Sequence, residues 1–281
     1  MTPSATAQAP GAAAPAHPAI APVPAFADNY IWLLRDLDGR RAVVVDPGDA
    51  DPVLAALSAA GLTLAAVLVT HHHADHVGGL PALREAFPDA VVHGPAASRA
   101  EGIDRRWRHG DTLALEGFDA SLRVIEVPGH TLDHVAYFAT RIGDDPRPVL
   151  FCGDTLFAGG CGRVFEGTPQ QMTASLGRLA ALPDDTLVFC AHEYTASNLR
   201  FARAVEPANA ALAERERDTA ALRAAGTPTV PSRLSLERAT NPFLRTDEPA
   251  VREAVRARLG HEPADAVETF AAVRQWKDGF R

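Results

Sequence analysis

The sequence predicts an α/β protein of layered sheets, followed by a segment made of helices alone. From residue 29 to residue 192, short β-branched runs alternate with Ala- and Leu-rich stretches, a pattern typical of sheets with intervening helices. Beyond residue 193 the strand-like runs stop and helical patterns follow. The chain has 281 residues, 47% of them hydrophobic, which is enough for one large domain or two ordinary ones.

Strands and helices can be placed along the chain by composition, period and end signals. Eight runs have the make-up of strands: 30–34, 42–45, 65–69, 90–93, 122–127, 135–139, 149–151 and 186–190. Helices are expected between them at 52–60, 79–87 and 169–182, the last ending before Pro183. Four later helices are expected at 198–205, 208–225, 248–259 and 265–276, with a Pro-containing stretch at 226–242.

The two ends of the chain differ from its middle. Residues 1–24 are mostly Ala and Pro without Lys or Arg, so they lack the charges of a secretory signal or a mitochondrial presequence. We expect a disordered tail over 1–24, a mixed α/β domain over 25–195 and a helical domain over 196–281.

Charge and cysteine content exclude several classes of partner. Lys and Arg number 27 against 35 Asp and Glu, and the net charge of −8 argues against nucleic acid or an anionic membrane. The longest apolar-leaning run, 59–70, is too short to span a membrane. Cys152, Cys161 and Cys190 are an odd number without zinc-finger spacing, so we expect no disulfide framework and a cytoplasmic location.

A dense cluster of potential metal ligands follows the strand at 65–69. It reads Thr-His-His-His-Ala-Asp-His over residues 70–76, and its nitrogen and oxygen donors suit zinc, iron or manganese. In an extended or tightly turning segment, His71 and His73 point the same way while Asp75 and His76 turn toward a second point nearby. His72 then faces away. A histidine-rich surface loop or a tag is the alternative, but a tag is not expected in mid-chain after a buried strand, and the dense packing of ligand types disfavours both.

Other strands end on side chains of the same kind. His130, Asp154 and His192 each come directly after or within a few residues of a predicted strand, where functional groups gather in sheets of this kind. Asp46 follows a further strand; it either orients a ligand histidine or only forms a turn.

These residues carry a resemblance to a known family. The run from Thr70 to His76, followed in order by His130, Asp154 and His192, resembles the metallo-β-lactamase superfamily. Four phrases further resemble glyoxalase II, the hydroxyacylglutathione hydrolase family: Gly-Cys-Gly-Arg at 160–163, Cys-Ala-His-Glu-Tyr-Thr at 190–195, Asn-Pro-Phe at 241–243 and Arg-Gln-Trp-Lys-Asp at 274–278. The resemblance covers about residues 25–281.

The resemblance implies an αββα sandwich of the metallo-β-lactamase type followed by a helical C-terminal domain that helps to bind glutathione. It also implies two divalent metal ions, most often Zn²⁺, with Fe or Mn as alternatives. One set of ligands is His71, His73 and His130; the other is Asp75, His76 and His192; Asp154 bridges the two.

The implied reaction is hydrolysis of S-2-hydroxyacylglutathione, typically S-lactoylglutathione, to a 2-hydroxy acid and glutathione. Metal ions make bound water partly ionised near neutral pH, so a bridging hydroxide can attack the thioester carbonyl. Asp75 and Asp154 hold this machinery in place, and no serine or cysteine nucleophile is required.

The substrate brings two carboxylates and one ammonium group to an acidic protein, so a local cationic cluster is needed. Candidates are Arg163, the hydroxyl of Tyr194, and Arg274 with Lys277, which share one face of a helix at spacing i,i+3. A solvated helix end that complements the helix dipole is the alternative for the last two.

The chain departs from the family pattern at a few positions. Arg163 and Phe165 stand where many relatives carry Lys and Tyr, so one hydroxyl contact to the peptide is missing. Asp133 stands where glycine is common, and Cys161 is read as a small packing residue.

Three functions remain open at the level of the sequence. The first is the thioester hydrolase, acting as a monomer on a small-molecule glutathione thioester. A persulfide dioxygenase, which would hold one iron through two histidines and one aspartate, or another hydrolase of the same fold such as a lactonase, is the second. A non-catalytic binding protein is the third. The complete set of seven ligands and the long helical segment favour the first.

Overall fold

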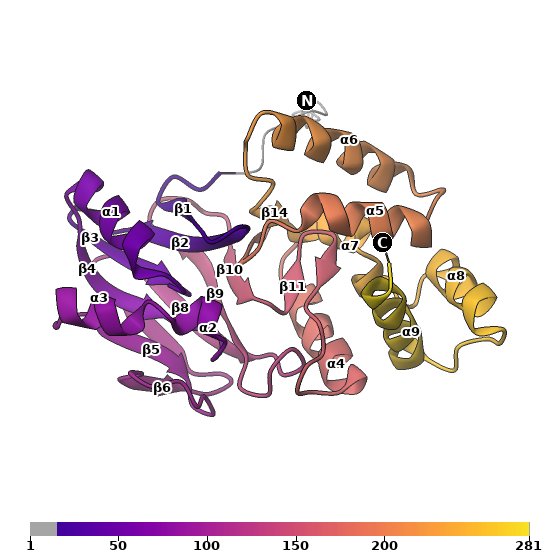
Figure 1. Ribbon diagram of the computed structural model, residues 1–281, viewed down its shortest axis with the longest axis horizontal. Coiled ribbons are helices and arrows are strands. Elements are labelled where there is room, and N and C mark those ends of the chain that lie inside the picture. The colour runs from indigo at the N-terminus through magenta and orange to yellow at the C-terminus, as the bar shows by residue number, and fades with distance from the viewer. Residues whose placement is uncertain (1–15, 281) are drawn as a thin grey trace, which may run out of the picture.

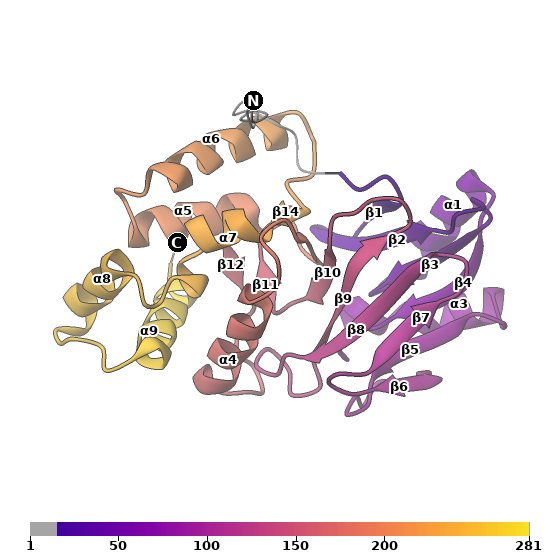
Figure 2. The same cartoon turned by 180° about the vertical axis from the view of Figure 1, so that it is seen from behind.

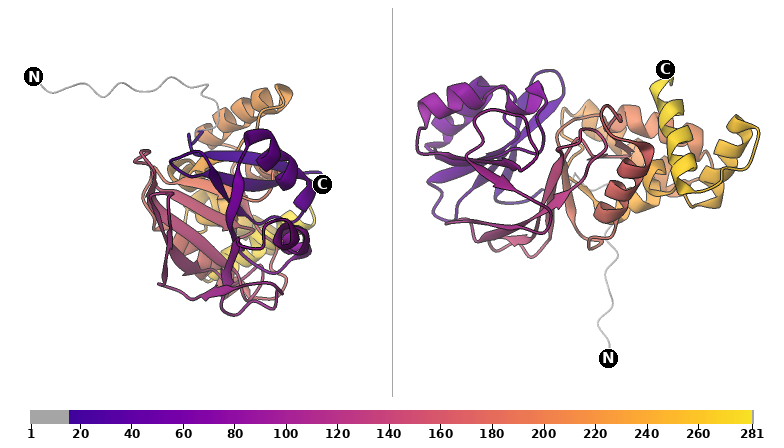
Figure 3. Two further views of the ribbon diagram at one scale, coloured as in Figure 1. Left: turned by 90° about the vertical axis from the view of Figure 1, so that its left-hand side faces the viewer. Right: turned by 90° about the horizontal axis from the view of Figure 1, so that it is seen from below.

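A computed structural model describes residues 16–280 of the chain. Two six-stranded sheets pack face to face, with helices on the outside, and a cluster of helices lies against one end of this sandwich (Figure 1). The same division along the long axis is seen from behind and from below (Figures 2 and 3). The predicted α/β class, with its helical C-terminal part, is confirmed.

The first sheet has the order β1-β2-β3-β4-β5-β6. Its strands and the helices that connect them are β1 (Ile20–Ala25), β2 (Asn29–Arg35), β3 (Arg41–Val45), α1 (Ala50–Ala60), β4 (Thr63–Leu68), α2 (Ala74–Val77), α3 (Leu80–Ala86), β5 (Val91–Pro95) and β6 (Arg105–Trp107). Strands β1 to β3 are antiparallel and β3 to β6 are parallel. Helix α1 begins at the capping carboxylate of Asp49 and ends at Gly61, whose φ of 65° suits glycine.

The second sheet has the order β14-β13-β10-β9-β8-β7. Its elements are β7 (Thr112–Leu115), β8 (Ala120–Glu126), β9 (Val135–Ile142), β10 (Val149–Gly153), β13 (Leu187–Cys190) and β14 (Ser232–Arg233); a small hairpin of β11 (Leu156–Phe157) and β12 (Gly160–Cys161) and helix α4 (Pro169–Ala180) lie between β10 and β13. Thr168 and Gln171 form a capping box at the start of α4.

Side chains alternate along β2 between two apolar layers. Trp32 and Leu34 belong to the main core between the sheets, together with Leu122 of β8, whereas Ile31 and Leu33 face the outer layer under α1 and α3. Because successive side chains of a strand point to opposite faces of the sheet, alternate residues of β2 contribute to the two apolar layers. Because strands of both sheets are fixed by this core, the loops at their ends are held rigidly.

The remaining helices are α5 (Thr195–Val205), α6 (Ala210–Ala224), α7 (Leu234–Thr240), the 3-10 turn η1 (Pro242–Leu244), α8 (Pro249–Leu259) and α9 (Ala266–Asp278). Glu237 of α7 and Arg215 of α6 form a buried ion pair, and Glu237 also accepts a hydrogen bond from the Gly159 amide at 2.8 Å. The helical part is thereby tied to the β11–β12 hairpin. None of the helices in the described residues is long and apolar enough to cross a membrane.

Two expectations about organisation are corrected. The tail expected over residues 1–24 is wrong from Ile20 onward, because β1 pairs with β2 along its whole length. Pro22 and Pro24 argued against a strand in the sequence, but both are exposed on an edge strand, where proline is tolerated. Ile20 and Val23 of the same strand are buried. Residues 1–15 of the expected tail lie outside the described residues.

The expectation that strands stop after residue 193 is also wrong. The Pro-containing stretch 226–242, for which no strand or helix was predicted, contains β14 and α7, and β14 pairs with β13 at the edge of the second sheet. A two-residue strand has no period from which the sequence could reveal it.

Candidate metal centre

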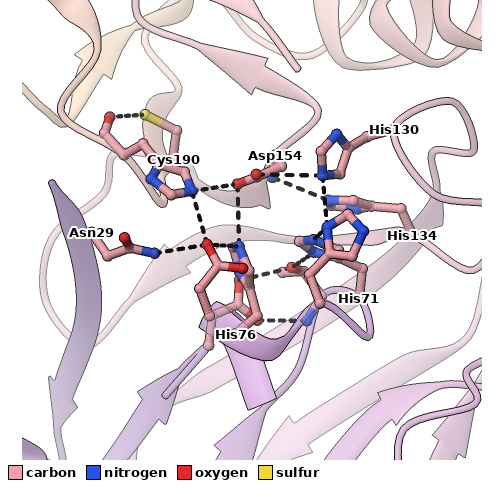
Figure 4. A network of polar contacts seen from close by, with 12 residues as sticks. Asn29, His71, His76, His130, His134, Asp154 and Cys190 are labelled. Carbon is pink, nitrogen blue, oxygen red and sulfur yellow. Dashed lines mark hydrogen bonds and ion pairs between the residues drawn. The ribbon is translucent and has the colours of Figure 1, made fainter. Parts of the chain in front are cut away.

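The end of the sandwich that faces the helices carries the predicted ligands. The segment after β4, the segment between β8 and β9, and the ends of β10 and β13 meet there, as Figure 4 shows for His71, His76, His130 and Asp154. All seven predicted ligand side chains lie in this one cluster.

The first group of donors consists of His71, His73 and His130. Nδ1 of His73 lies 3.1 Å from Nε2 of His71 and 3.0 Å from Nε2 of His130. Three imidazole nitrogens thus converge on one point, a donor set that zinc and iron accept.

The second group consists of Asp75, His76 and His192. Oδ2 of Asp75 lies 3.6 Å from Nε2 of His76 and also 3.6 Å from Nε2 of His192. Asp75 and His76 both belong to the short helix α2, which begins directly after His73.

Asp154 lies between the two groups. Its Oδ1 is 3.4 Å from Nε2 of His76 and 3.3 Å from Nε2 of His192, and its Oδ2 is 3.5 Å from Nε2 of His130 (Figure 4). Gly153 permits this placement, because its φ is +46° and a Cβ there would stand 2.3 Å from Oγ1 of Thr70. One carboxylate can therefore serve both groups.

Buried atoms in the cluster fit a cation. Among the described residues, neither Nε2 of His76 nor Oδ1 of Asp154 has a hydrogen-bond partner, although both atoms are buried. Buried polar atoms without a partner are rare and need an explanation such as an ion. The mixture of imidazole nitrogens and carboxylate oxygens fits divalent transition metals.

Electrostatics in the cluster shift the pKa values of the histidines in both directions and keep the shared carboxylate charged. Burial lowers the pKa of His71 well below its usual value, which leaves its nitrogen lone pair free. Burial opposes ionisation of Asp154, but His76 and His192 together hold its pKa well below the usual value. Burial likewise lowers the pKa of His76, and Asp154 and Asp46 more than reverse this, so positive charge is stabilised between the two carboxylates.

Neighbouring polar groups orient most of the ligands. Asp46 accepts hydrogen bonds of 2.7 Å from both the amide and the hydroxyl of Thr70, and its Oδ2 lies 3.0 Å from Nδ1 of His76. Asp46 is thus more than a turn residue, the bland alternative at the level of the sequence. Nδ1 of His130 bonds the carbonyl of Arg163 at 2.8 Å.

A cavity of about 460 Å³ opens from the cluster toward the helices. Its wall includes His130 and Asp154 at the metal end, and all four predicted substrate-binding residues: Arg163, Tyr194, Arg274 and Lys277. Tyr194 stacks on His192 with ring centroids 4.7 Å apart. The cavity therefore joins the candidate metal centre to a cationic region.

Comparison with known proteins agrees with this geometry. The metallo-β-lactamase superfamily matches residues 26–192, and the hydroxyacylglutathione hydrolase C-terminus matches residues 193–280. A curated hydroxyacylglutathione hydrolase of Cupriavidus taiwanensis is 55% identical over 268 residues, covering 93% of this chain and 99% of that protein. The chain belongs to the hydroxyacylglutathione hydrolase family.

Solved structures support the architecture. ETHE1 from Myxococcus xanthus is 37% identical with a TM-score of 0.51, over 59% of this chain and 71% of that one. The BLEG-1 B3 metallo-β-lactamase has a TM-score of 0.59 at 24% identity, over 80% of this chain and 99% of that one, which shows the shared fold. The predicted sandwich of the metallo-β-lactamase type is confirmed.

The three cationic residues of the cavity wall differ in their exposure and in their bonds to the protein. The Arg274 guanidinium is buried and donates to the Cys161 carbonyl at 3.0 Å and to Oδ1 of Asp278 at 2.9 Å, so it holds α9 against β12. Nζ of Lys277 donates to the Ser197 carbonyl at 3.1 Å, and burial together with the nearby Arg274 lowers its pKa to about 8. The side chain of Arg163 is 65% exposed, and its Nε lies 3.7 Å from Oδ1 of Asp278.

Three polar residues around the cluster were not found from the sequence. Nδ1 of His192 bonds Oδ1 of Asp28 at 3.0 Å, and Asn29 donates to Asp75 at 3.2 Å. An Asp-Asn pair in a turn is too common to signal this role. Nε2 of His134 accepts a hydrogen bond from the Asp154 amide at 3.1 Å, and the His134 ring stacks on His71 with centroids 4.5 Å apart. These contacts depend on the register of the hairpin formed by β8 and β9, which the sequence does not reveal.

Proposed function

We propose that this member of the hydroxyacylglutathione hydrolase family hydrolyses the thioester of S-2-hydroxyacylglutathiones, S-lactoylglutathione among them, to a 2-hydroxy acid and glutathione. The observation that carries the proposal is the cavity that leads from the seven-donor cluster to Arg163 and Lys277. A thioester at the cluster would place its glutathione carboxylates toward these cations. The reaction fits a cytoplasmic monomer, and the three cysteines are free and buried.

We further propose that the cluster holds two divalent metal ions, zinc in the first instance with iron or manganese as alternatives. His71, His73 and His130 would hold one, Asp75, His76 and His192 the other, and Asp154 both. Such ions supply Lewis acidity toward the thioester carbonyl oxygen and lower the pKa of water at the site.

The chain's own residues bind and orient the substrate. Lys277 and Arg163 offer positive charge to the glutathione carboxylates, and the Tyr194 hydroxyl offers a hydrogen bond beside His192. Arg274 keeps α9 and Lys277 in position through its bonds to Cys161 and Asp278. Because thiolate is a good leaving group, the glutathione sulfur needs no strong general acid from the protein.

In this proposal, the helical segment 196–281 is the substrate-binding domain and the sandwich, extended to include β1, is the catalytic domain. The division of labour follows from the cavity, whose wall includes His130 and Asp154 from the sandwich and Ser197 and Lys277 from the helices.

Steady-state assays with S-lactoylglutathione, a simple lactone and glutathione persulfide, together with elemental analysis, test the proposal. We expect turnover of the first substrate only and close to two transition-metal ions per chain. One firmly held iron with oxygen consumption on the persulfide would instead establish a dioxygenase. Preferred turnover of the lactone would establish a lactonase, and no turnover of any of the three would favour a binding protein.

A further inference from the structure

We propose that His72, the histidine of the ligand run that points away from the metal centre, is a positioning residue for the ligand His73, acting through its bond to Asp133. The inference rests on the proposed two-metal function.

His73 lacks the support that the other ligand histidines have. The second ring nitrogens of His71, His130 and His192 bond Thr70, the Arg163 carbonyl and Asp28, and Nδ1 of His76 lies beside Asp46. His73 turns Nδ1 toward the centre, and within residues 16–280 no protein group bonds its Nε2. Since a second bond normally fixes a ligand histidine, His73 depends more than the other ligand histidines on its backbone and on the Phe165 ring, whose centroid lies 5.9 Å away.

His72 fixes that backbone from the opposite side. Its side chain is only 8% exposed, and Nδ1 lies 2.8 Å from Oδ1 of Asp133, which is also buried and accepts a bond of 2.7 Å from the Thr131 hydroxyl. Arg99 donates to Nε2 of His72 at 2.6 Å, so Nε2 is the acceptor and Nδ1 carries the proton given to Asp133. The hydrogen bond therefore has one defined direction.

The bond joins two loops that each supply a ligand of the first group. Asp133 lies three residues after His130, and His72 directly precedes His73. On the outer side, Arg99 also binds Glu166 at 3.0 Å, and Glu166 accepts the Leu132 amide at 2.9 Å. The adjacent Phe165 ring packs on His73 and His130, with centroids 5.9 and 5.2 Å away. The His72–Asp133 bond thus sets the spacing of His73 and His130.

Loss of this bond is expected to weaken the first metal position more than the fold. Removing a partner that bonds a ligand directly lowers metal affinity by roughly 10- to 100-fold. His72 acts on His73 through one peptide unit, so we expect about a tenfold loss, at the low end of that range.

The test measures zinc affinity in the full chain by competition with a chromogenic zinc chelator. His72→Ala and Asp133→Ala remove the bond; His72→Asn, whose amide nitrogen stands near the place of Nδ1, and Asp133→Asn, which keeps an acceptor oxygen, preserve it. His93→Ala is the matched control, since it also removes a buried imidazole, but one whose Nδ1 accepts a bond of 3.1 Å from the Trp107 indole of β6. Melting temperature and kcat at saturating zinc are recorded alongside.

We expect both alanine variants to release one of two zinc ions at about tenfold lower chelator concentration, with kcat restored by excess zinc, and both amide variants and His93→Ala to resemble the wild type. If His72→Ala holds zinc as His93→Ala does, or if His72→Asn is as defective as His72→Ala, the inference is overturned. Should His72→Ala not fold, the Asp133 pair decides by the same comparison. A wild-type chain that binds no second ion would refute the proposed function instead, so the two failures are distinguishable.

Discussion

Replacement of Lys277 by alanine tests how the cavity recognises glutathione. Nζ of Lys277 lies in the cavity wall, anchored to the Ser197 carbonyl at 3.1 Å and held over the Phe201 ring at 5.4 Å. Its target would be a glutathione carboxylate remote from the thioester, so the contact would be the same in the ground and transition states. The variant should therefore raise KM and leave kcat unchanged.

The size of the effect follows from a hydrogen bond between charged groups. Such a bond contributes ~1.5–3 kcal/mol, which corresponds to roughly ten- to a hundredfold in kcat/KM. Lys277 is partly exposed, which lowers the expected change to about tenfold. Arg256→Ala is the matched control, because it removes one positive charge from exposed α8 away from the cavity.

The lowered pKa of Lys277 adds a second signature. With a pKa of about 8, caused by burial and then by Arg274, the ammonium is charged below pH 8 and neutral above it. The KM of the wild type should rise between pH 7 and 9, whereas Lys277→Arg, which stays charged, should lose that dependence.

Steady-state kinetics with S-lactoylglutathione and with a small thioester lacking glutathione measure both signatures. Equal losses on the two substrates would show that Lys277 supports the fold rather than the substrate, and a flat KM profile in the wild type would refute the titration. Unchanged kinetics in Lys277→Ala would refute the glutathione assignment of this wall.

The other predictions concern metal, helical packing and the edge strand. Asp154→Asn should lose metal by elemental analysis and lower turnover more than ~100-fold. Asp145→Asn, in the loop between β9 and β10 at the opposite end of β10 from Asp154, should keep its metal and its turnover. Glu237→Ala leaves Arg215 buried and unpaired, so urea unfolding should show a loss of ~3–5 kcal/mol, while alanine at exposed Glu253 changes little. A chain that starts at Phe26 lacks the buried side chains of Ile20 and Val23, so its free energy of unfolding should be lower by at least ~3 kcal/mol. An unchanged midpoint of urea unfolding would contradict the docking of β1.

Elements with a strong period were predictable from the sequence. The β-branched run that forms β3 and the amphipathic pattern of α4 carry their own signal, because burial on one face imposes a period of two or of about 3.6 residues. Short or atypical elements were missed: β1 contains two prolines and β14 has two residues, so neither has a readable pattern.

The ligand run 70–76 and the order of His130, Asp154 and His192 are properties of the sequence alone, because metal donors crowded after strands are rare by chance. What only the tertiary structure decided is the support around them. Asp28 reaches His192 because the start of β2 pairs with the segment after β13, where the Tyr30 amide donates to the Ala191 carbonyl at 2.7 Å and the Glu193 amide to the Asp28 carbonyl at 2.8 Å. His72 reaches Asp133 because two loops 61 residues apart meet. Hydrogen bonds depend on distances of a few tenths of an ångström between segments far apart in the chain, and only packing of the whole core sets such distances.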